Sequence, residues 1–249
     1  MNLKDITIGT IQFSSLSEDE IVEFVDYTIQ NKGKATIAYA NAHVVIESEK
    51  NKDLRKNINA FTLIKPDGIG VYYASKILTH NQESFKLLKN ATDFNYRLLD
   101  YSDKHGRNIY LLGSTDDVLT AAKKYIKTHF PNIKIVGSHN GYFNLSDAAI
   151  AENINSSNVD ILLVGMGVPR QELWLQGHVK ELSVPVSITV GAFIEFISQR
   201  KRRAPNTMRK FGLEWLFRLL QEPCRLWKRY VIGIPYFIFV VFKQKYIKL

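Results

Sequence analysis

The chain has 249 residues, 45% hydrophobic and 23% charged, which is typical of a globular protein with one large core or two smaller ones. Its single cysteine, Cys224, excludes an internal disulfide framework and a cysteine-based zinc site. The net charge of +9 is uneven, because residues 200–249 hold 13 Lys and Arg against 2 Asp and Glu, whereas residues 1–199 hold 20 against 22. Such a basic segment favours a polyanionic partner: a nucleic acid, an anionic membrane or a phosphorylated substrate.

The sequence contains no window with the ~20 apolar residues that a membrane-spanning helix needs. Its first residues, MNLKDITIGTIQF, lack the basic start and long apolar run of a signal peptide. The single cysteine suits a reducing compartment.

Residues 1–199 alternate between helix-like and strand-like segments. A capping box from Ser17 to Glu20 opens a helix expected over 17–29. Almost wholly apolar strands separated by helices predict a parallel sheet covered on both faces. The fold class is therefore α/β, with a doubly wound, mostly parallel, Rossmann-like sheet. Strands are expected at 35–40, 63–66, 108–113, 133–137, 159–167 and 185–192, and further helices at 42–58, 114–130 and 169–182.

Ligands of such sheets bind outside the carboxyl ends of the strands. Several of these ends carry a glycine, which permits a tight turn and a close approach of backbone to ligand, although plain loop geometry is an equal alternative. They are Gly113, Gly137, Gly165 and Gly191.

Residues 200–249 form a basic, largely helical C-terminal appendage to the α/β domain of residues 1–199. Aromatic residues, leucines and arginines mix here, and residues 231–242 add a short apolar run broken by Gly233 and Pro235. This composition favours binding at an anionic membrane surface. The alternative is a final helix or two packed on the core with a solvated basic face. Nucleic-acid binding is disfavoured, because no known nucleic-acid-binding motif accompanies the charge.

Four stretches are unusual, although no phosphate-binding glycine motif, serine nucleophile elbow or paired metal-ligand histidines occur. Taken alone, Asp67 in KPDG is either a turn residue or a catalytic carboxylate. The stretches are YANAHVV (39–45), KPDGIGVYYASK (65–76), VGMGVPRQELWL (164–175) and RAPNTMRKFGLEWLFRLLQEPCRLWKRY (203–230).

In this order and spacing, the four stretches resemble the WecG/TagA/CpsF family, glycosyltransferase family twenty-six, over roughly residues 6–235. The stretch KIVGSHNGYF (134–143) also fits the family. The resemblance implies an inverting, metal-independent enzyme without cofactors that moves an N-acetylmannosamine-like or other hexose from a UDP-sugar. The acceptor would be a polyprenyl-diphosphate-linked saccharide, in bacterial teichoic acid or cell-surface polysaccharide synthesis. It also implies a peripheral protein on the cytoplasmic face of the inner membrane and a possible homo-oligomer.

The resemblance assigns Asp67 as the general base that takes the proton of the acceptor hydroxyl, a group that inverting transfer requires. Gly68 and Gly70 would let this loop approach a sugar closely. Asn41 and His43 would hydrogen-bond the donor sugar, with a partly buried structural imidazole as the alternative for His43.

The same resemblance places Gln171 and Glu172 at the start of a helix whose free N–H groups suit a diphosphate. Gln171 would hold substrate hydroxyls, whereas Glu172 would bind substrate or merely cap the helix. Glu195 would accept a hydrogen bond from the uracil ring.

Basic residues of the C-terminal appendage would neutralise the phosphates without a metal. Arg218 and Arg225 are seven residues apart, which would place them on one helix face, and Lys228 follows Arg225 by three. By resemblance, the appendage closes over the site and binds the lipid diphosphate; a basic face that touches only lipid headgroups is the alternative.

The chain departs from the family pattern in three places. Tyr39 stands where many members have Thr, and Gln199 stands where they have Gly. The family's Arg-x-x-Gly-x-Asp stretch is LKNATDF (88–94) here, which keeps Asp93 but has Ala91 for the Gly. Two rival functions remain for the whole chain: a non-enzymatic peripheral membrane adaptor on the same fold, and a nucleic-acid-binding protein.

Overall fold

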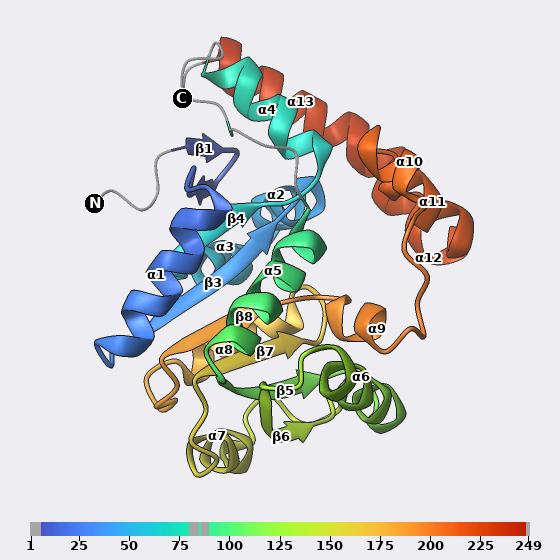
Figure 1. Ribbon diagram of the computed structural model, residues 1–249. Helices are drawn as coiled ribbons and strands as arrows, with labels where there is room; N and C mark the ends of the chain where they lie inside the picture. The colour runs from blue at the N-terminus through green and yellow to red at the C-terminus, as the bar shows by residue number, and fades with distance from the viewer. Residues whose placement is uncertain (1–5, 80–84, 86–89, 248–249) are drawn as a thin grey trace.

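The computed structural model describes residues 6–79, 85 and 90–247. Its centre is a six-stranded parallel sheet in the order β4-β3-β8-β7-β5-β6 (Figure 1). This confirms the predicted α/β, Rossmann-like sheet and brings the carboxyl ends of all six strands to one edge. The strands are β3 (Ala35–Ala40), β4 (Leu63–Pro66), β5 (Asn108–Gly113), β6 (Lys134–His139), β7 (Ile161–Gly165) and β8 (Val186–Thr189).

Alternate side chains of each strand enter two hydrophobic cores, one on each face of the sheet. In β7, Ile161 and Leu163 enter one core, and Leu162 and Val164 enter the other. Because both faces of the inner strands are buried, these strands are almost continuous apolar runs, whereas the edge strand β6 is only partly buried. One face is covered by α1 (Glu18–Gln30), α5 (Ala91–Lys104), α6 (Asp116–His129) and α9 (Phe193–Ile197). The other is covered by α2 (Ala42–Lys50), α3 (Lys52–Asn59), α4 (Ile69–Leu78), α7 (Ala148–Asn155) and α8 (Arg170–His178).

The helix expected over 42–58 is two helices, so that prediction was wrong in one respect. Asn51 ends α2 and begins α3, because its side-chain oxygen accepts hydrogen bonds from the amides of Asp53 and Leu54. The capping box of Ser17 and Glu20 on α1 is confirmed. An N-terminal antiparallel hairpin, β1 (Ile6–Ile8) and β2 (Ile11–Phe13), was not predicted.

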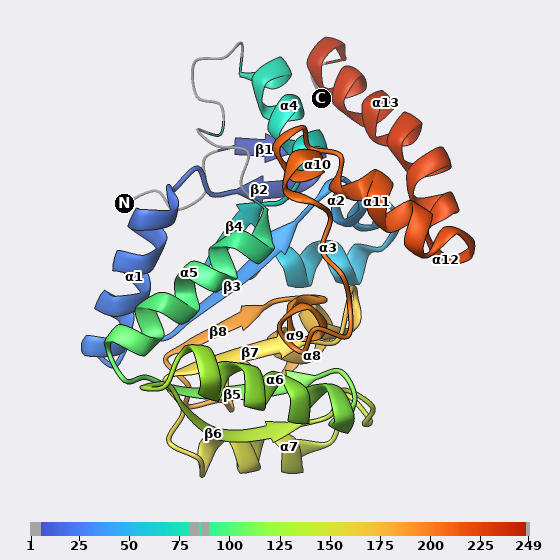
Figure 2. The ribbon, with the colours of Figure 1, turned by 45° about the vertical axis from the view of Figure 1, so that its right-hand side comes forward.

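Residues after α9 cross to a helical segment, as Figure 2 shows. It consists of α10 (Asn206–Lys210), α11 (Glu214–Gln221), α12 (Pro223–Trp227), the π-helical turn η1 (Lys228–Ile232) and α13 (Gly233–Tyr246). The predicted helical C-terminal appendage is thus present, whereas its separation as a domain at residue 200 stays a prediction.

One face of α13 packs on the rest of the chain. Its side chains Phe237 and Val241 are buried in the core that also holds α2 and α4, and Val240 is buried beside Gly9. A Cβ atom added at Gly70 would lie 3.6 Å from the Phe237 ring. Gln244 accepts a hydrogen bond from the Gly9 amide and donates one to the Thr7 carbonyl, each at 2.8 Å. The C-terminal helix is therefore fixed to both α4 and the N-terminal hairpin.

The opposite face of α13 is apolar and exposed. Across the described ranges, no helix is both long and apolar enough to span a membrane. The exposed side chains of this face and of η1 include Val231, Ile232, Tyr236, Ile238, Phe239, Phe242 and Tyr246.

Candidate active site

Asp67 lies at the carboxyl end of β4, directly beside the end of β3. Its backbone amide donates to the Ala40 carbonyl at 3.0 Å, which extends the pairing of the two strands by one residue. Its carboxylate Oδ1 accepts a hydrogen bond of 2.9 Å from the Ala91 amide, the first residue of α5. The strand end and the start of α5 therefore hold this half-buried carboxylate at the edge where parallel sheets bind ligands.

Asn41 follows the neighbouring strand β3 and faces Asp67. Its side-chain oxygen caps α2 by accepting from the amides of His43 (3.0 Å) and Val44 (3.3 Å). This use of the oxygen leaves the amide nitrogen pointing to Asp67 Oδ2, at 3.5 Å. The two residues quoted from separate motifs thus meet, and among the described residues Oδ2 has only this one long contact.

Gly68 follows Asp67 with a φ of +83°, a left-handed conformation that favours glycine. It is exposed, and a Cβ atom added there would meet no atom within 4 Å. The backbone at Gly68 therefore leaves space beside Asp67, and a close approach of this loop to a sugar stays a prediction.

His43 lies in the first turn of α2, half-buried, with Nδ1 3.9 Å from Glu47 Oε1. Burial, together with the positive charges of Arg229 and Lys50, lowers its pKa to about 4. The imidazole is therefore neutral near pH 7, so it can exchange hydrogen bonds but carries no positive charge for a phosphate.

Gln171 and Glu172 lie in the first turn of α8 and are buried. Gln171 Oε1 accepts from the amides of Gly167 and Gly191, each at 3.2 Å, and its Nε2 donates to Glu172 Oε1 at 2.7 Å. Gln171 therefore ties the loop after β7 to the loop after β8. Burial raises the pKa of Glu172 to about 7, although the Gln171 hydrogen bond opposes this. Its Oε2 has no hydrogen-bond partner within the described part of the chain.

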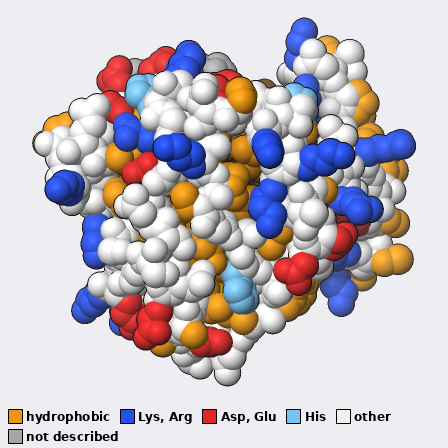
Figure 3. All heavy atoms as spheres, turned by 60° about the horizontal axis from the view of Figure 1, so that its bottom comes forward, with side chains coloured by type: hydrophobic (Ala, Val, Ile, Leu, Met, Phe, Trp, Pro, Cys, Tyr) orange, Lys and Arg blue, Asp and Glu red, His pale blue; other side chains and the backbone are white. Residues whose placement is uncertain are grey.

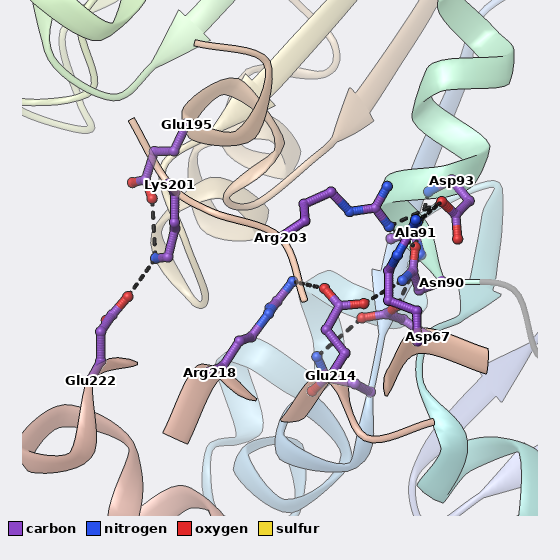
Figure 4. A network of polar contacts seen from close by, with 12 residues as sticks. Asp67, Asn90, Ala91, Asp93, Glu195, Lys201, Arg203, Glu214, Arg218 and Glu222 are labelled. Atoms are coloured by element: carbon purple, nitrogen blue, oxygen red, sulfur yellow. Dashed lines mark hydrogen bonds and ion pairs between the residues drawn. The ribbon is translucent and has the colours of Figure 1, made fainter. Parts of the chain in front are cut away.

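Glu195 lies in the first turn of α9, after β8, and is joined to the C-terminal segment. Lys201 Nζ lies 3.2 Å from Glu195 Oε2 and 2.7 Å from Glu222 Oε1 (Figure 4). In this structure, the carboxylate proposed for uracil is paired with an ammonium group.

The three basic residues predicted to bind phosphate lie in different environments. Arg218 donates to Glu214 Oε1 at 2.9 Å. Arg225 is exposed and pairs with Glu222, and Lys228 is exposed. The spacing argument for Arg218 and Arg225 was wrong, because α11 ends at Gln221 and Pro223 begins a new helix.

Sequence reasoning assigned no role to the residues that connect the C-terminal segment to Asp67. Asn90 caps α5 and donates from Nδ2 to Glu214 Oε2 at 2.5 Å, next to Ala91 (Figure 4). Arg203 and Arg209 pair with Asp93 at 3.0 and 3.3 Å. Signals for them existed: Asn90 precedes Asp93 by three residues, a cap pattern, and Arg203 and Glu214 stand inside quoted motifs.

The family departures also have structural explanations. Ala91 contacts Asp67 through its backbone amide, so a glycine is not needed for that contact. Gln199 adopts a φ of +60°, the conformation that favours the family's glycine. Tyr39 is buried and donates to Asn95 Oδ1 at 2.6 Å. Residues 88 and 89 of the changed stretch lie outside the described residues.

Comparisons with known proteins agree with the resemblance found in the sequence. The model of the glycosyl transferase WecG/TagA/CpsF family matches residues 6–249. An N-acetylglucosaminyldiphosphoundecaprenol N-acetyl-beta-D-mannosaminyltransferase of Bacillus subtilis (strain 168) is 31% identical over 229 residues, 90% of this chain and 87% of that protein. The protein of the same name from Staphylococcus aureus (strain MW2) is 28% identical over 252 residues, 98% of this chain and 94% of that protein.

Proposed function

The chain belongs to the WecG/TagA/CpsF family of glycosyl transferases, and from this premise we propose that it moves a sugar from a UDP-sugar onto a polyprenyl-diphosphate-linked acceptor. The relatives' names specify an N-acetylmannosaminyl group and an N-acetylglucosaminyl acceptor on undecaprenyl diphosphate. We propose the same acceptor class here, with N-acetylmannosamine or another hexose as the donated sugar. The observation that carries the proposal is the Asp67–Asn41 pair at adjacent strand ends, beside a segment rich in arginine.

Asp67 is the proposed general base of a single displacement. The acceptor hydroxyl oxygen forms a bond to the anomeric carbon while the bond from that carbon to the diphosphate oxygen breaks, which inverts the configuration. The proton of the hydroxyl goes to Asp67 Oδ2, since Oδ1 is held by the Ala91 amide. Asn41 orients that oxygen, and Gly68 leaves room for the sugar.

The departing diphosphate carries negative charge that must be stabilised. We propose that arginines of the C-terminal segment do this without a metal or other cofactor. Gln171, Glu172 and Glu195 then belong to the donor side of the site. Gln171 positions the two loops on which the donor lies, because its buried oxygen joins Gly167 and Gly191. Lys201 must release Glu195 for that carboxylate to accept from uracil.

The exposed apolar face of α13 is the proposed contact with an anionic membrane on the cytoplasmic side. Lys and Arg side chains gather on the right of Figure 3, beside exposed hydrophobic side chains. This mixture suits a lipid interface, where apolar side chains enter the headgroup region and cations bind anionic lipids. A possible homo-oligomer stays a prediction.

A transfer assay tests the enzymatic proposal. The purified protein would be incubated with a soluble polyprenyl-diphosphate N-acetylglucosamine acceptor and a panel of UDP-sugars, with and without EDTA. We expect transfer from one or a few of them, undiminished by EDTA. Absence of transfer from every UDP-sugar would reject the proposal, and loss of activity in EDTA would reject metal independence.

Sedimentation with anionic vesicles tests the membrane proposal. Phe239→Glu and Phe242→Glu place a charge on the exposed face of α13, so both variants should lose vesicle binding. Tyr27→Glu makes a similar change on the exposed face of α1 and should bind as the wild type does. Equal binding by all four proteins, or binding to oligonucleotides but not to vesicles, would contradict a lipid contact at this face.

A further inference from the structure

Most arginines of the C-terminal segment already have a carboxylate partner. Arg229 is different, because it is half-buried and forms no hydrogen bond or ion pair with any residue that the structure describes. Its guanidinium lies 5.6 Å from the centre of the Tyr230 ring. The paired arginines are Arg200, Arg203, Arg209, Arg218 and Arg225.

Arg229 lies on the face of the C-terminal helices that packs against the rest of the chain. Leu226, three residues earlier, is buried. A Cβ atom added at Gly233, four residues later, would lie 3.5 Å from Ile46 of α2. Phe237, another four residues on, lies at the start of α4, where a Cβ atom added at Gly70 would be 3.6 Å from its ring and 3.6 Å from Ala42 of α2. Residues spaced by three or four share a helix face, so Arg229 points to the helix starts that follow β3 and β4.

The charges around Arg229 agree with this position. The positive charge of Arg229 contributes to the lowered pKa of His43 in α2. The negative charge of Asp67 in turn favours the charged form of Arg229. Asp67 and Arg229 form no ion pair with each other; the contacts of the carboxylate are with the Ala91 amide and the Asn41 side chain. The guanidinium therefore lies on the side of the C-terminal helices that faces the candidate base, and its donors have no partner among the described residues.

A partly buried cation without a partner is unfavourable, since it loses hydration without gaining an opposite charge. Burial is also the main cause that lowers the pKa of Arg229, although an arginine remains charged at neutral pH. Arg229 lies on the π-helical turn η1, and such turns are frequent at functional sites. The position of Arg229 on the inner side of this turn is thus suited to an anion.

We propose that Arg229 is a phosphate-binding residue of this site, whose guanidinium holds the oxygens of a diphosphate next to Asp67. Arginine suits this task because its planar fork donates two parallel hydrogen bonds to phosphate oxygens. The diphosphate belongs either to the nucleotide of the donor or to the prenyl group of the acceptor. This inference rests on the proposed function and adds to it Arg229, a residue of the quoted C-terminal stretch to which the sequence analysis gave no role.

Calorimetric titration of the full chain tests this assignment. The probes are UDP, farnesyl diphosphate as a soluble prenyl diphosphate, and uridine, which has no phosphate. The proteins are the wild type, Arg229→Gln, Arg229→Lys and Arg202→Gln, which removes an exposed arginine of the same segment.

Arg229→Gln should bind at least one diphosphate about 10- to 100-fold more weakly, the effect of losing a charged hydrogen bond. Arg229→Lys should recover part of the loss, and Arg202→Gln should match the wild type. Uridine affinity should be unchanged in all four proteins, which shows that the fold is intact. Weakened binding of UDP alone assigns the donor diphosphate, and weakened binding of farnesyl diphosphate alone assigns the acceptor.

Unchanged affinity of Arg229→Gln for both diphosphates would overturn the assignment while leaving the proposed function in place. A wild-type protein that binds neither UDP nor farnesyl diphosphate would instead contradict the proposed function, and the role of Arg229 with it.

Discussion

Glu172→Gln should remove a pH dependence of stability that arises where Gln171 joins the loops after β7 and β8. The Glu172 side chain is 0% exposed, and burial raises its pKa from 4.5 to about 7. The folded protein therefore holds this proton more tightly than the unfolded chain does. The free energy of unfolding must then fall as the pH rises from about 4.5 through about 7.

The size of the effect follows from the shift. Raising the pKa by about 2.5, at 1.36 kcal/mol per unit, contributes about 3 kcal/mol to the free energy of unfolding at low pH. Most of this contribution is lost between about pH 5 and pH 8. Glutamine has nearly the same shape and keeps an oxygen to accept from Gln171, but it has no proton to lose. The variant should therefore be the more stable protein at pH 8 by about 2–3 kcal/mol, with a much smaller difference at pH 5.

Urea unfolding of both proteins at pH 5 and pH 8 measures this difference. Taking the difference between the free energies of unfolding of the two proteins at each pH removes contributions from other groups. One such group is His43, whose pKa is lowered to about 4. The contribution of His43 has the opposite sign, because it is present above pH 6.5 and is lost as the pH falls through about 4. An equal change of stability with pH in the wild type and the variant would refute the reasoning about Glu172.

Three further substitutions test the neighbour of the candidate base and the packing of the C-terminal helices. Asn41→Ala removes a helix cap and the amide beside the carboxylate. The free energy of unfolding in urea should fall by about 1 kcal/mol, and the initial transfer rate should fall about tenfold or more. Unchanged rates would contradict a role for this amide. Gly212→Val places a Cβ atom 2.4 Å from the Ile69 side chain, at a residue whose φ of +70° favours glycine. A protease should then cleave residues 206–246 faster than in the wild type. Equal cleavage rates would argue against this packing. Gln244→Ala loses two hydrogen bonds, at about 1 kcal/mol each, and the Gly9 amide should exchange hydrogen faster; equal exchange would show that the contact is not formed in solution.

The sheet was predictable because its strands are buried on both faces, so runs such as Ile161–Gly165 are apolar throughout. Breaks in helices were harder to foresee. Asn51 is compatible with a helical pattern and acts as a cap only because its side chain turns to the next helix. Pro223 starts a helix rather than continuing one, which removed the common face assumed for Arg218 and Arg225.

The candidate site was predictable only where residues follow neighbouring strands. Asn41 and Asp67 meet because β3 and β4 are adjacent in a parallel sheet. The pairing of Arg203 with Asp93 joins residues 110 positions apart, and no local periodicity encodes it. The same is true of the inward direction of Arg229, which depends on how α13 packs. Long-range packing therefore decided which basic residues face the candidate base.

Transfer by Asp67→Asn tests the central claim most directly. Asparagine keeps the size and an oxygen to accept from the Ala91 amide, but it cannot take up the proton of an acceptor hydroxyl. We expect the variant to bind UDP with wild-type affinity and to unfold at a similar urea concentration, while its transfer rate falls by about 100-fold or more. A transfer rate close to that of the wild type, with UDP binding intact, would contradict the assignment of Asp67 as the base.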